Sequence, residues 1–384
     1  MVDLSHQHID PDIEPQPIFA TESTDTVGAK VSVFKRHKKL FIALWIVLAV
    51  VIVAGGTVGA LALIHSHQPP AKAAPKTTKT VVPPPAPVYY SPLTGEKVAS
   101  KAATTAPVTG VMIENSPDAR PQSGLKSAGV VFEAIAEGGI TRFMALYQQE
   151  KPQLIGPVRS LRQYDIDWLA PFNAGIAHVG GSAEALTEIR SGQWRDLDQF
   201  FNGGSYWRAT DRYAPHNVYT SFQKLDALNA SKGYTSSNVL GFSRKDSTPA
   251  KNLTATKINV TISSSLYNSS YAYNAATNTY DRSQGGAPHL DREAGQISPR
   301  VVVVMSVQEK TVMQDGYREQ ITTVGSGPAW IFQDGTEQAV TWHKISQAAQ
   351  ITFTDANGAD VTLARGQTWL TAVPGNEGGN VTWQ

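Results

Sequence analysis

The hydrophobic pattern of the chain is dominated by residues 40–64, an apolar run that no charged side chain interrupts. As a helix this segment is roughly 37 Å long, enough to cross a hydrocarbon core of about 30 Å. Basic residues at positions 35, 36, 38 and 39 precede it and favour a cytoplasmic N-terminal side. We therefore predict a transmembrane helix at 40–64 after a disordered cytoplasmic tail at 1–39. A cleaved signal peptide is the alternative, although its apolar region is about 7–15 residues long and lies nearer the N-terminus.

Residues 65–91 are rich in proline, alanine, threonine and lysine, and we predict a stiff linker there. Beyond it, residues 92–247 alternate short apolar strands with helical patterns. The predicted strands are 111–113, 130–135, 143–147 and 175–179, and the predicted helices are 160–172, 182–190 and 220–229. This alternation predicts a three-layer α/β domain.

Residues 255–384 change character, with runs of β-branched and aromatic residues separated by Asn-Gly, Asp-Gly and Gly-Gly turns. They show no helical period. We predict a second, mostly antiparallel β domain here, which makes the fold class α+β overall: one N-terminal transmembrane helix, an α/β domain and a β-rich domain.

The amino-acid composition and the net charge exclude several kinds of site and partner. The 384 residues are 41% hydrophobic and 17% charged, which suits a folded body. A formal net charge of +1 gives no bulk attraction to nucleic acid, so we predict no nucleic-acid partner. Cysteine is absent, which excludes disulfides, zinc-thiolate sites, a thiol nucleophile and a lipid-modified cysteine. We therefore expect the helix to be the anchor.

The most informative polar cluster is IGPVRSLRQYDIDWLAPF. Arg159 lies just before the predicted helix start, Ser160 is the expected N-cap with Gln163 at the third position, and Arg162 falls in the first turn. Cations are disfavoured at a helix N-terminus by about 0.3–1 kcal/mol each, so two of them there suggest an anion held between guanidinium and N–H groups. The alternative is that Arg162 pairs with Asp165 and that Arg159 faces water or one of the nearby acids.

Two further segments bring polar groups to the predicted sheet. In HVGGSAEAL, His178 ends a strand and Ser182 caps the following helix, which adds N–H groups at the carboxyl edge of the sheet. His178 alone is more often a core histidine than a catalyst. Glu133 and Glu137 have the spacing that places two side chains on one strand face, and Arg142 opens the next strand. These two acids are candidate acid–base groups, or a salt-bridged strand edge.

A proline-containing loop carries Arg208, Arg212, His216 and Asn217. Loops with this mixture often touch ligand, although internal hydrogen bonds explain it equally well. His289 and Asp291 supply only two potential metal ligands, so we predict no metal site and assign no cofactor. The Walker, Gly-x-Ser-x-Gly, His-Glu-x-x-His and Gly-x-Gly-x-x-Gly motifs are all missing from the sequence.

From about Ser91 onward the chain contains the stretches GVMIENSPDARPQSGL, VVFEAIAEGGITRFMALYQ, IGPVRSLRQYDIDWLAPF, HVGGS and APHNVYTS, with GYR and GQTW further on. In these stretches it resembles the YerB-like bacterial extracytoplasmic proteins, a family of unknown function. It implies an α/β domain followed by a β-rich domain outside the membrane. Lipoprotein members of that family are held by an N-terminal cysteine, whereas a helix is expected to anchor this chain.

A more distant similarity in layout links TRFMALYQQEKPQLIGPVRS and AHVGGSAEAL to the LytR-CpsA-Psr phosphotransferases, which are single-span proteins that transfer glycopolymers from a polyprenyl pyrophosphate carrier. The resemblance implies that Arg142 and Arg159 hold a pyrophosphate. Ser160 stands where that family has an aspartate, which argues against magnesium-assisted transfer.

These observations lead to two hypotheses. In the first, an envelope protein binds a phosphorylated or acidic component, such as a polyprenyl phosphate or wall polymer, with or without phosphoryl or glycopolymer transfer. In the second, the protein is a non-catalytic binding or scaffolding protein whose arginines are structural. Whether the chain is an enzyme stays open. The expected anion-binding residues are Arg142, Arg159, Arg162, Arg212, His178, Ser182 and Asn217, and the candidate catalytic residues are Glu133, Glu137 and His216.

Overall fold

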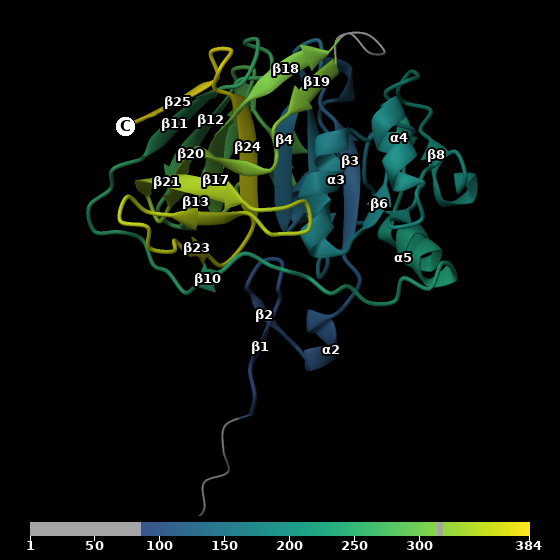
Figure 1. Ribbon diagram of the computed structural model, residues 1–384, viewed down its shortest axis with the longest axis horizontal. Helices are drawn as coiled ribbons and strands as arrows, with labels where there is room; N and C mark the ends of the chain where they lie inside the picture. The colour runs from purple at the N-terminus through teal and green to yellow at the C-terminus, as the bar shows by residue number, and fades with distance from the viewer. Residues whose placement is uncertain (1–85, 313–317) are drawn as a thin grey trace, which may run out of the picture. The chain divides into compact units, whose positions relative to one another are not determined.

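The computed structural model describes residues 86–312 and 318–384, which belong to one compact unit, Pro84–Gln384 (Figure 1). The predicted tail, the predicted transmembrane helix and most of the predicted linker lie outside the described residues. Within the described ranges, no helix has the length and apolar character needed to cross a bilayer. Strands predominate and helices are few, so the α+β class is confirmed for this part of the chain.

A twelve-stranded mixed sheet forms the centre of the unit. Its main path runs in the order β22-β21-β20-β17-β24-β4-β5-β3-β6-β7, and the hairpin β18–β19 joins it at β4. We call residues 92–247 the first segment and residues 255–384 the later, β-rich segment. The strands of the first segment are β3 (Thr109–Glu114), β4 (Val130–Glu137), β5 (Ile140–Tyr147), β6 (Gly175–Ala177) and β7 (Arg195–Asp196). The others are β17 (Val301–Val307), β18 (Glu309–Val312), β19 (Arg318–Ile321), β20 (Gly325–Gln333), β21 (Thr336–Lys344), β22 (Thr352–Thr354) and β24 (Thr368–Pro374).

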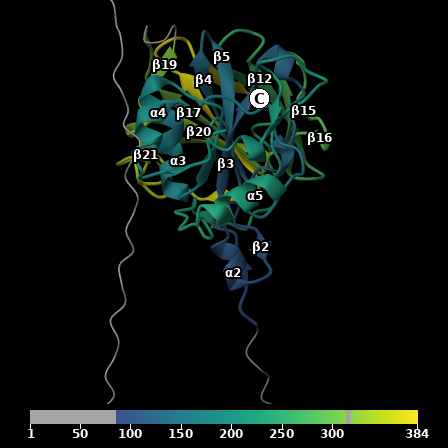
Figure 2. The same ribbon diagram turned by 90° about the vertical axis from the view of Figure 1, so that its right-hand side faces the viewer.

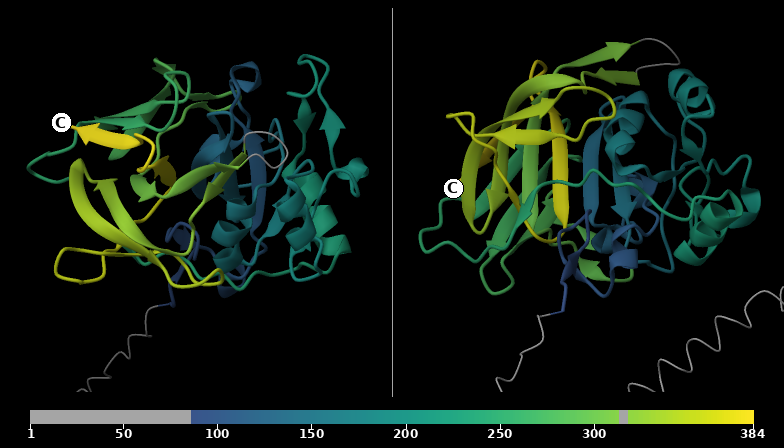
Figure 3. Two further views of the ribbon diagram at one scale, coloured as in Figure 1. Left: turned by 45° about the horizontal axis from the view of Figure 1, so that its top comes forward. Right: turned by 60° about the horizontal axis from the view of Figure 1, so that its bottom comes forward.

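The sheet is continuous across the two predicted domains. Strand β24 pairs in parallel with β4, with Thr368 opposite Val130 and Thr371 opposite Glu133. On its other side β24 pairs in parallel with β17. Figure 3 shows the yellow strand β24 beside the blue strands of the first segment. Antiparallel pairing was predicted for residues 255–384 and is confirmed for most described pairs there, with β17–β24 as an exception. The division into two domains stays a prediction.

Helices cover both faces of the sheet in the first segment, as a three-layer arrangement requires. The helices are α3 (Gln163–Leu169), η4 (Ala170–Phe172), α4 (Ala183–Ile189) and α5 (Phe222–Ser231). Trp168 of α3 and Ile189 of α4 share a core with Met112 and Phe132, whereas Phe222 of α5 packs in a separate core on the opposite face. Figure 2 shows β3 between α3 and α4 on one side and α5 on the other.

A second, five-stranded antiparallel sheet covers one face of the main sheet in the later segment. Its order is β14-β13-β12-β11-β25, and its core joins Ile258, Val260 and Tyr271 to Val302 and Val304 of β17. These strands are β11 (Lys257–Thr261), β12 (Ser269–Asn274), β13 (Thr279–Gln284), β14 (Ala287–Pro288) and β25 (Asn380–Trp383). The remaining short elements are β1 (Tyr89–Tyr90), β2 (Lys97–Val98), α2 (Lys101–Thr104), η2 (Pro117–Ala119), η3 (Leu125–Ser127), η5 (Gly203–Ser205), β8 (Trp207–Arg208), β9 (Val218–Tyr219), β10 (Arg244–Lys245), β15 (Leu290–Asp291), β16 (Gly295–Gln296) and β23 (Leu363–Ala364).

Helix α3 begins later than predicted. Its N-cap is Arg162, whose backbone N–H donates to Asp165 Oδ2 at 2.8 Å, so Ser160 as the N-cap is wrong. The reason is that residues 159–161 are held in extended form. Arg159 N–H donates to the Met112 carbonyl at 2.9 Å, and Leu161 N–H donates to the Gly180 carbonyl at 3.0 Å. Because these bonds hold the main chain extended, the first helical turn does not begin at Ser160. The predicted Ser182 cap of α4 is confirmed, because its side chain accepts from Ala185 N–H.

Candidate functional site

The candidate site lies where strands β3 and β4 end. Both strands pair antiparallel with the intervening β5, and they therefore run in the same direction. Strand β6 is parallel to β3, so Glu114, Glu137 and His178 all lie at carboxyl ends of neighbouring strands. This edge is where ligands gather in open α/β sheets.

Glu137 is the centre of the first charge group. Its Oε1 lies 3.0 Å from Arg142 Nη2, and its other oxygen forms an ion pair with Arg162. Arg142 also donates from Nη1 to the Ser160 carbonyl at 3.1 Å. The expected pairing of Arg162 with Asp165 involves only the Arg162 backbone, because the guanidinium group pairs with Glu137. Two predicted arginines therefore meet at one predicted acid.

The expectation that Glu133 and Glu137 share a strand face is wrong. The register shifts between Ile135 and Glu137, and a β-bulge of this kind inserts a residue and reverses the alternation of side chains. The Glu133 carboxylate is buried in the core, away from Glu137. Its Oε2 lies 2.7 Å from Arg282 Nη2 and accepts from Trp369 Nε1 at 3.1 Å. Glu133 is thus sealed inside the protein and separated from the arginines of the strand edge.

Glu114 is the centre of the adjoining charge group. Its Oε1 lies 3.3 Å from Arg159 Nε and 2.8 Å from His216 Nδ1, and it accepts from Ser116 Oγ at 2.8 Å. Ser116 Oγ lies 3.2 Å from the same His216 Nδ1. A Ser-His-acid triad needs the serine and the acid on opposite ring nitrogens. Here both contact Nδ1, so this geometry is not that of an activated serine nucleophile.

Burial and mutual repulsion act on the arginines of this edge. Burial lowers the pKa of Arg162, and the nearby charge of Arg318 lowers that pKa further, against the opposing effects of Tyr164 and Asp165. Burial likewise lowers the pKa of Arg159, where Glu114 opposes the shift and Arg142 adds to it. We use the name arginine cluster for Arg142, Arg159, Arg162 and Arg318. Within it, Arg318 repels Arg162 and Arg142 repels Arg159.

Several buried polar atoms in this region have no hydrogen-bond partner among the residues that the structure describes. They include Nε of Arg142, Nε of Arg162 and Oε2 of Glu114. Each of these residues is at most 5% exposed. A buried donor without a partner costs about 1–3 kcal/mol, and such atoms therefore concentrate where proteins bind ligands or ordered water.

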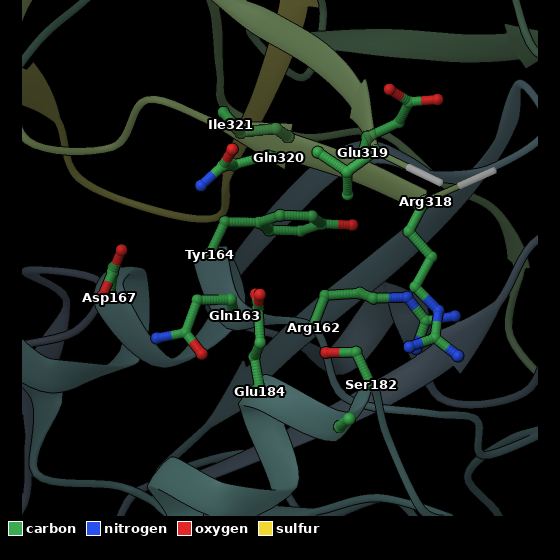
Figure 4. Close-up of a pocket in the computed structure, with 12 residues that line it drawn as sticks. Arg162, Gln163, Tyr164, Asp167, Ser182, Glu184, Arg318, Glu319, Gln320 and Ile321 are labelled. Atoms are coloured by element: carbon green, nitrogen blue, oxygen red, sulfur yellow. The ribbon is translucent and has the colours of Figure 1, made fainter. Parts of the chain in front are cut away.

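A cavity of about 160 Å³ opens beside Arg162 (Figure 4). Its walls come from the beginnings of α3 and α4 and from the hairpin β18–β19, and they include Arg162, Tyr164, Asp167, Ser182, Glu184 and Arg318. In Figure 4 the guanidinium groups of Arg162 and Arg318 lie together at one side, and the Ser182 side chain lies near them. We call this cavity the pocket. Asp165, in the first turn of α3, is buried, which raises the pKa of its carboxyl to about 6 despite the hydrogen bond from Arg162 N–H.

Several predicted site residues have structural partners away from the pocket. His178 Nδ1–H donates to the Gly180 carbonyl at 2.7 Å, and its Nε2 lies 3.1 Å from Asp196 Oδ1. Asn217 donates to the carbonyls of Ala209 and Arg212 and therefore closes its own loop. Arg212 donates to two loop carbonyls, those of Asp118 and Pro121, so it lies beyond Glu114 and His216 rather than beside Arg162.

Within the described ranges no group of three or more potential ligand side chains is placed to hold a metal ion, and His289 and Asp291 contact other residues of the protein. His289 lies 3.1 Å from Gln122 Oε1 and contacts Arg282, and Asp291 accepts from the N–H groups of Glu293 and Ala294. Burial and the Arg282 charge lower the pKa of His289 well below its usual range.

Sequence reasoning missed Glu114 and Arg318. Glu114 directly follows the predicted strand 111–113 and is the last residue of the observed strand β3, and its position at a carboxyl strand end was a usable signal. Arg318 reaches the site only because β19 pairs with β4, with Arg318 opposite Glu137. No local pattern indicates that pairing.

Comparisons with known proteins give consistent matches. The models of the N-terminal and C-terminal domains of a protein of unknown function, DUF3048, match residues 93–235 and 258–370. The protein named "Putative lipoprotein YerB" of Bacillus subtilis (strain 168) is 32% identical over 303 residues, which cover 77% of this chain and 89% of that protein. The crystal structure of YerB from Bacillus subtilis superposes with a TM-score of 0.69 at 28% identity, covering 77% of this chain and 99% of the other.

Proposed function

This chain belongs to the DUF3048 family of YerB-like proteins, and from this premise we propose that it is a membrane-anchored envelope protein that binds an acidic ligand. The relative's description as a lipoprotein supports attachment to the outer side of a membrane. For this chain we propose that residues 40–64 are the anchor, and that the ligand places a phosphate or carboxylate against Arg162 and Arg318 in the pocket.

The observation that carries the proposal is the arginine cluster with its buried, unpartnered donors. Nε of Arg142 and Nε of Arg162 have no acceptor in the described part of the chain, although both side chains are buried. Arg142 and Arg162 share the single carboxylate of Glu137, and Arg162 lines the pocket together with Arg318. An anion in the pocket supplies an acceptor for the unpartnered Nε of Arg162.

The geometry favours binding over phosphoryl or glycopolymer transfer. Of the candidate catalytic residues, Glu133 is sealed against Arg282, and Glu137 is held between two guanidinium groups. His216 directs Nδ1 to Glu114 and lies outside the pocket lining. No titratable side chain of these three is therefore placed for proton transfer to a ligand at Arg162. The similarity in layout to the LytR-CpsA-Psr phosphotransferases stays a prediction.

A scaffolding function is the second candidate, and one observation favours it. Arg142 and Arg162 both pair with Glu137, as arginines that only hold the fold together also do. The two candidates differ in whether the pocket has measurable affinity for anions.

Calorimetric titration of the full-length protein in lipid nanodiscs tests the proposal. The probes are inorganic phosphate, pyrophosphate, glycerol phosphate and acetate. We expect Arg318→Ala to weaken binding at least tenfold, because a charge-assisted hydrogen bond contributes about 1.5–3 kcal/mol. Arg162→Lys keeps the charge but loses the planar donor pair, and we expect an intermediate loss.

The matched control is Arg365→Ala. Arg365 pairs with Asp246 and lies over the Tyr90 ring of β1, whereas the pocket is beside β19 at the opposite end in Figure 1. Equal affinity of the native protein, Arg318→Ala and Arg162→Lys for these probes, or no binding of any of them, would leave the scaffolding function.

A further inference from the structure

The pocket carries negative charge as well as positive charge. Glu184, in the first turn of α4, is exposed, and its side chain has no ion-pair or hydrogen-bond partner among the described residues. In Figure 4 its carboxylate points into the middle of the pocket, whereas Arg162 and Arg318 occupy one side. Asp167 lies on the opposite side in that view.

Both carboxylate oxygens of Asp167 already accept hydrogen bonds, which hold this side chain in place at one end of the pocket. Its oxygens accept from the Thr323 hydroxyl and from Gln347 Nε2, the latter at 2.7 Å. Gln347 Nε2 also donates to Glu188 at 2.7 Å, and Gln163 Nε2 donates to the other oxygen of Glu188. The amide groups of this wall are therefore occupied by its own carboxylates. The third lining carboxylate, Glu319, accepts from the Thr311 hydroxyl with both oxygens. Glu184 is therefore the lining carboxylate that has no such partner among the described residues and that a ligand can engage.

A ligand with only negative charge fits this arrangement poorly. Two like charges inside one small cavity lie closer than the screening length of about 8–10 Å at physiological salt, so the Glu184 and Asp167 carboxylates oppose any anion seated at Arg162. A positive group on the same ligand removes this opposition and pairs with Glu184. The pocket then has one complementary partner for each end of the ligand.

We propose that the ligand is a small zwitterion, with a phosphate or carboxylate for Arg162 and Arg318 and a primary ammonium group for Glu184. This inference rests on the proposed function, because it assumes that the arginine end binds the anionic group. It adds the class of ligand: a free zwitterion or a zwitterionic head group of a larger envelope molecule.

The size of the pocket limits the ligand. One bound water needs about 10–15 Å³ of cavity volume, so the 160 Å³ of the pocket hold on the order of ten non-hydrogen atoms. A dipeptide or a phosphorylethanolamine group has this size. A lipid tail or a sugar chain attached to such a group has to remain outside the cavity.

Matched pairs of probes test the inference on the full-length protein in nanodiscs. Phosphorylethanolamine is compared with ethyl phosphate, and alanylalanine with N-acetyl-alanylalanine; in each pair the second compound keeps the anionic group and lacks the ammonium. We expect the zwitterion of at least one pair to bind at least tenfold more tightly than its partner. The pair that shows the difference tells whether the anionic group is a phosphate or a carboxylate.

The variant Glu184→Gln isolates the ammonium contact. It is expected to reduce the affinity for the zwitterion to that of its matched anion and to leave or improve the affinity for the anion itself. Glu150→Gln, which changes an exposed loop carboxylate outside the pocket lining, is the control and should change neither.

The outcomes separate this inference from the proposed function. Equal binding of both members of each pair, sensitive to Arg318→Ala but not to Glu184→Gln, overturns the zwitterion and keeps the anion site. Absence of binding by all four probes and by inorganic phosphate overturns both. Tighter binding of the zwitterions that survives in Glu184→Gln also overturns the inference, because the ammonium then pairs elsewhere.

Discussion

Glu309, the first residue of β18, buries a carboxylate with no compensating group. The residue is 3% exposed, and neither carboxylate oxygen has a hydrogen-bond partner in the described part of the chain. Its main chain is fixed, because Glu309 N–H donates to Asn376 Oδ1 at 2.9 Å and its carbonyl accepts from Asn376 Nδ2 at 2.7 Å. These two bonds hold the Glu309 Cα, from which the buried side chain extends, in place.

Burial, together with the carboxylates of Glu319 and Glu377, raises the pKa of Glu309 from its usual 4.5 to about 8. Between these pH values the folded protein keeps a proton that the unfolded chain has lost. The free energy of unfolding therefore falls as the pH rises from about 4.5 to 8 and is constant with respect to this group above that range. At about 1.4 kcal/mol for each pH unit, the loss is at most about 5 kcal/mol.

The perturbation is Glu309→Gln, which has the shape and neutrality of the protonated acid. We expect the variant to match the native protein near pH 5 and to be more stable by several kcal/mol at pH 9, up to the limit of about 5 kcal/mol. The measurement is urea unfolding of the full-length protein in detergent at pH 5, 7 and 9, followed by tryptophan fluorescence. Glu150→Gln is the control.

The result that refutes this reasoning is a stability difference between Glu309→Gln and the native protein that is the same at pH 5 and pH 9. Such a result would mean that the Glu309 carboxylate is ionised in the folded protein at pH 5, which requires a solvated or paired side chain. A destabilised variant at pH 9 would refute it equally, because the native carboxylate would then be making favourable contacts.

Three further predictions follow from other buried groups. Glu133→Gln leaves the Arg282 charge buried without its ion pair, so we expect a loss of about 3–5 kcal/mol in urea unfolding at pH 7, with no loss in Glu150→Gln. Ser182→Ala removes the side-chain cap of α4 and should cost about 1 kcal/mol in the same assay, whereas Ser182→Asp should cost little. His289 should remain neutral at pH 5 in ¹⁵N NMR spectra because its pKa is lowered, and its burial should reduce stability as the pH falls below the usual 6.5; a charged ring at pH 5 would contradict this.

The local pattern of the sequence was sufficient for the elements that surround the site. The apolar run at 130–135 and the helical pattern at 160–172 predicted a strand and a helix, and strand β4 and helix α3 lie in these stretches. The Ser182 cap was also predictable, since it depends on neighbouring residues alone. The convergence of Arg142 and Arg162 could be expected because both lie near ends of adjacent elements.

Features that depend on distant pairing could not be predicted. The bulge before Glu137 separates it from Glu133, and a period-two pattern assumes regular register. The N-cap of α3 moved to Arg162 because residues 159–161 bond to Met112 and Gly180. The partners Glu114 and Arg318 depend on which strand lies beside which, and the pairing of β24 with β4 joins residues more than 200 positions apart.

The same distant pairings show what the β-rich segment contributes. One wall of the pocket comes from α3 and α4, and the other comes from β18–β19, which supplies Arg318 opposite Glu137. The core behind the site is joined in the same way, since Glu133 of β4 pairs with Arg282 of β13 and accepts from Trp369 of β24. An isolated first segment would retain Arg142, Arg159 and Arg162 but would expose them to water, where each guanidinium contact is worth far less. The affinity proposed for the pocket therefore requires both segments, even though separate family models describe them.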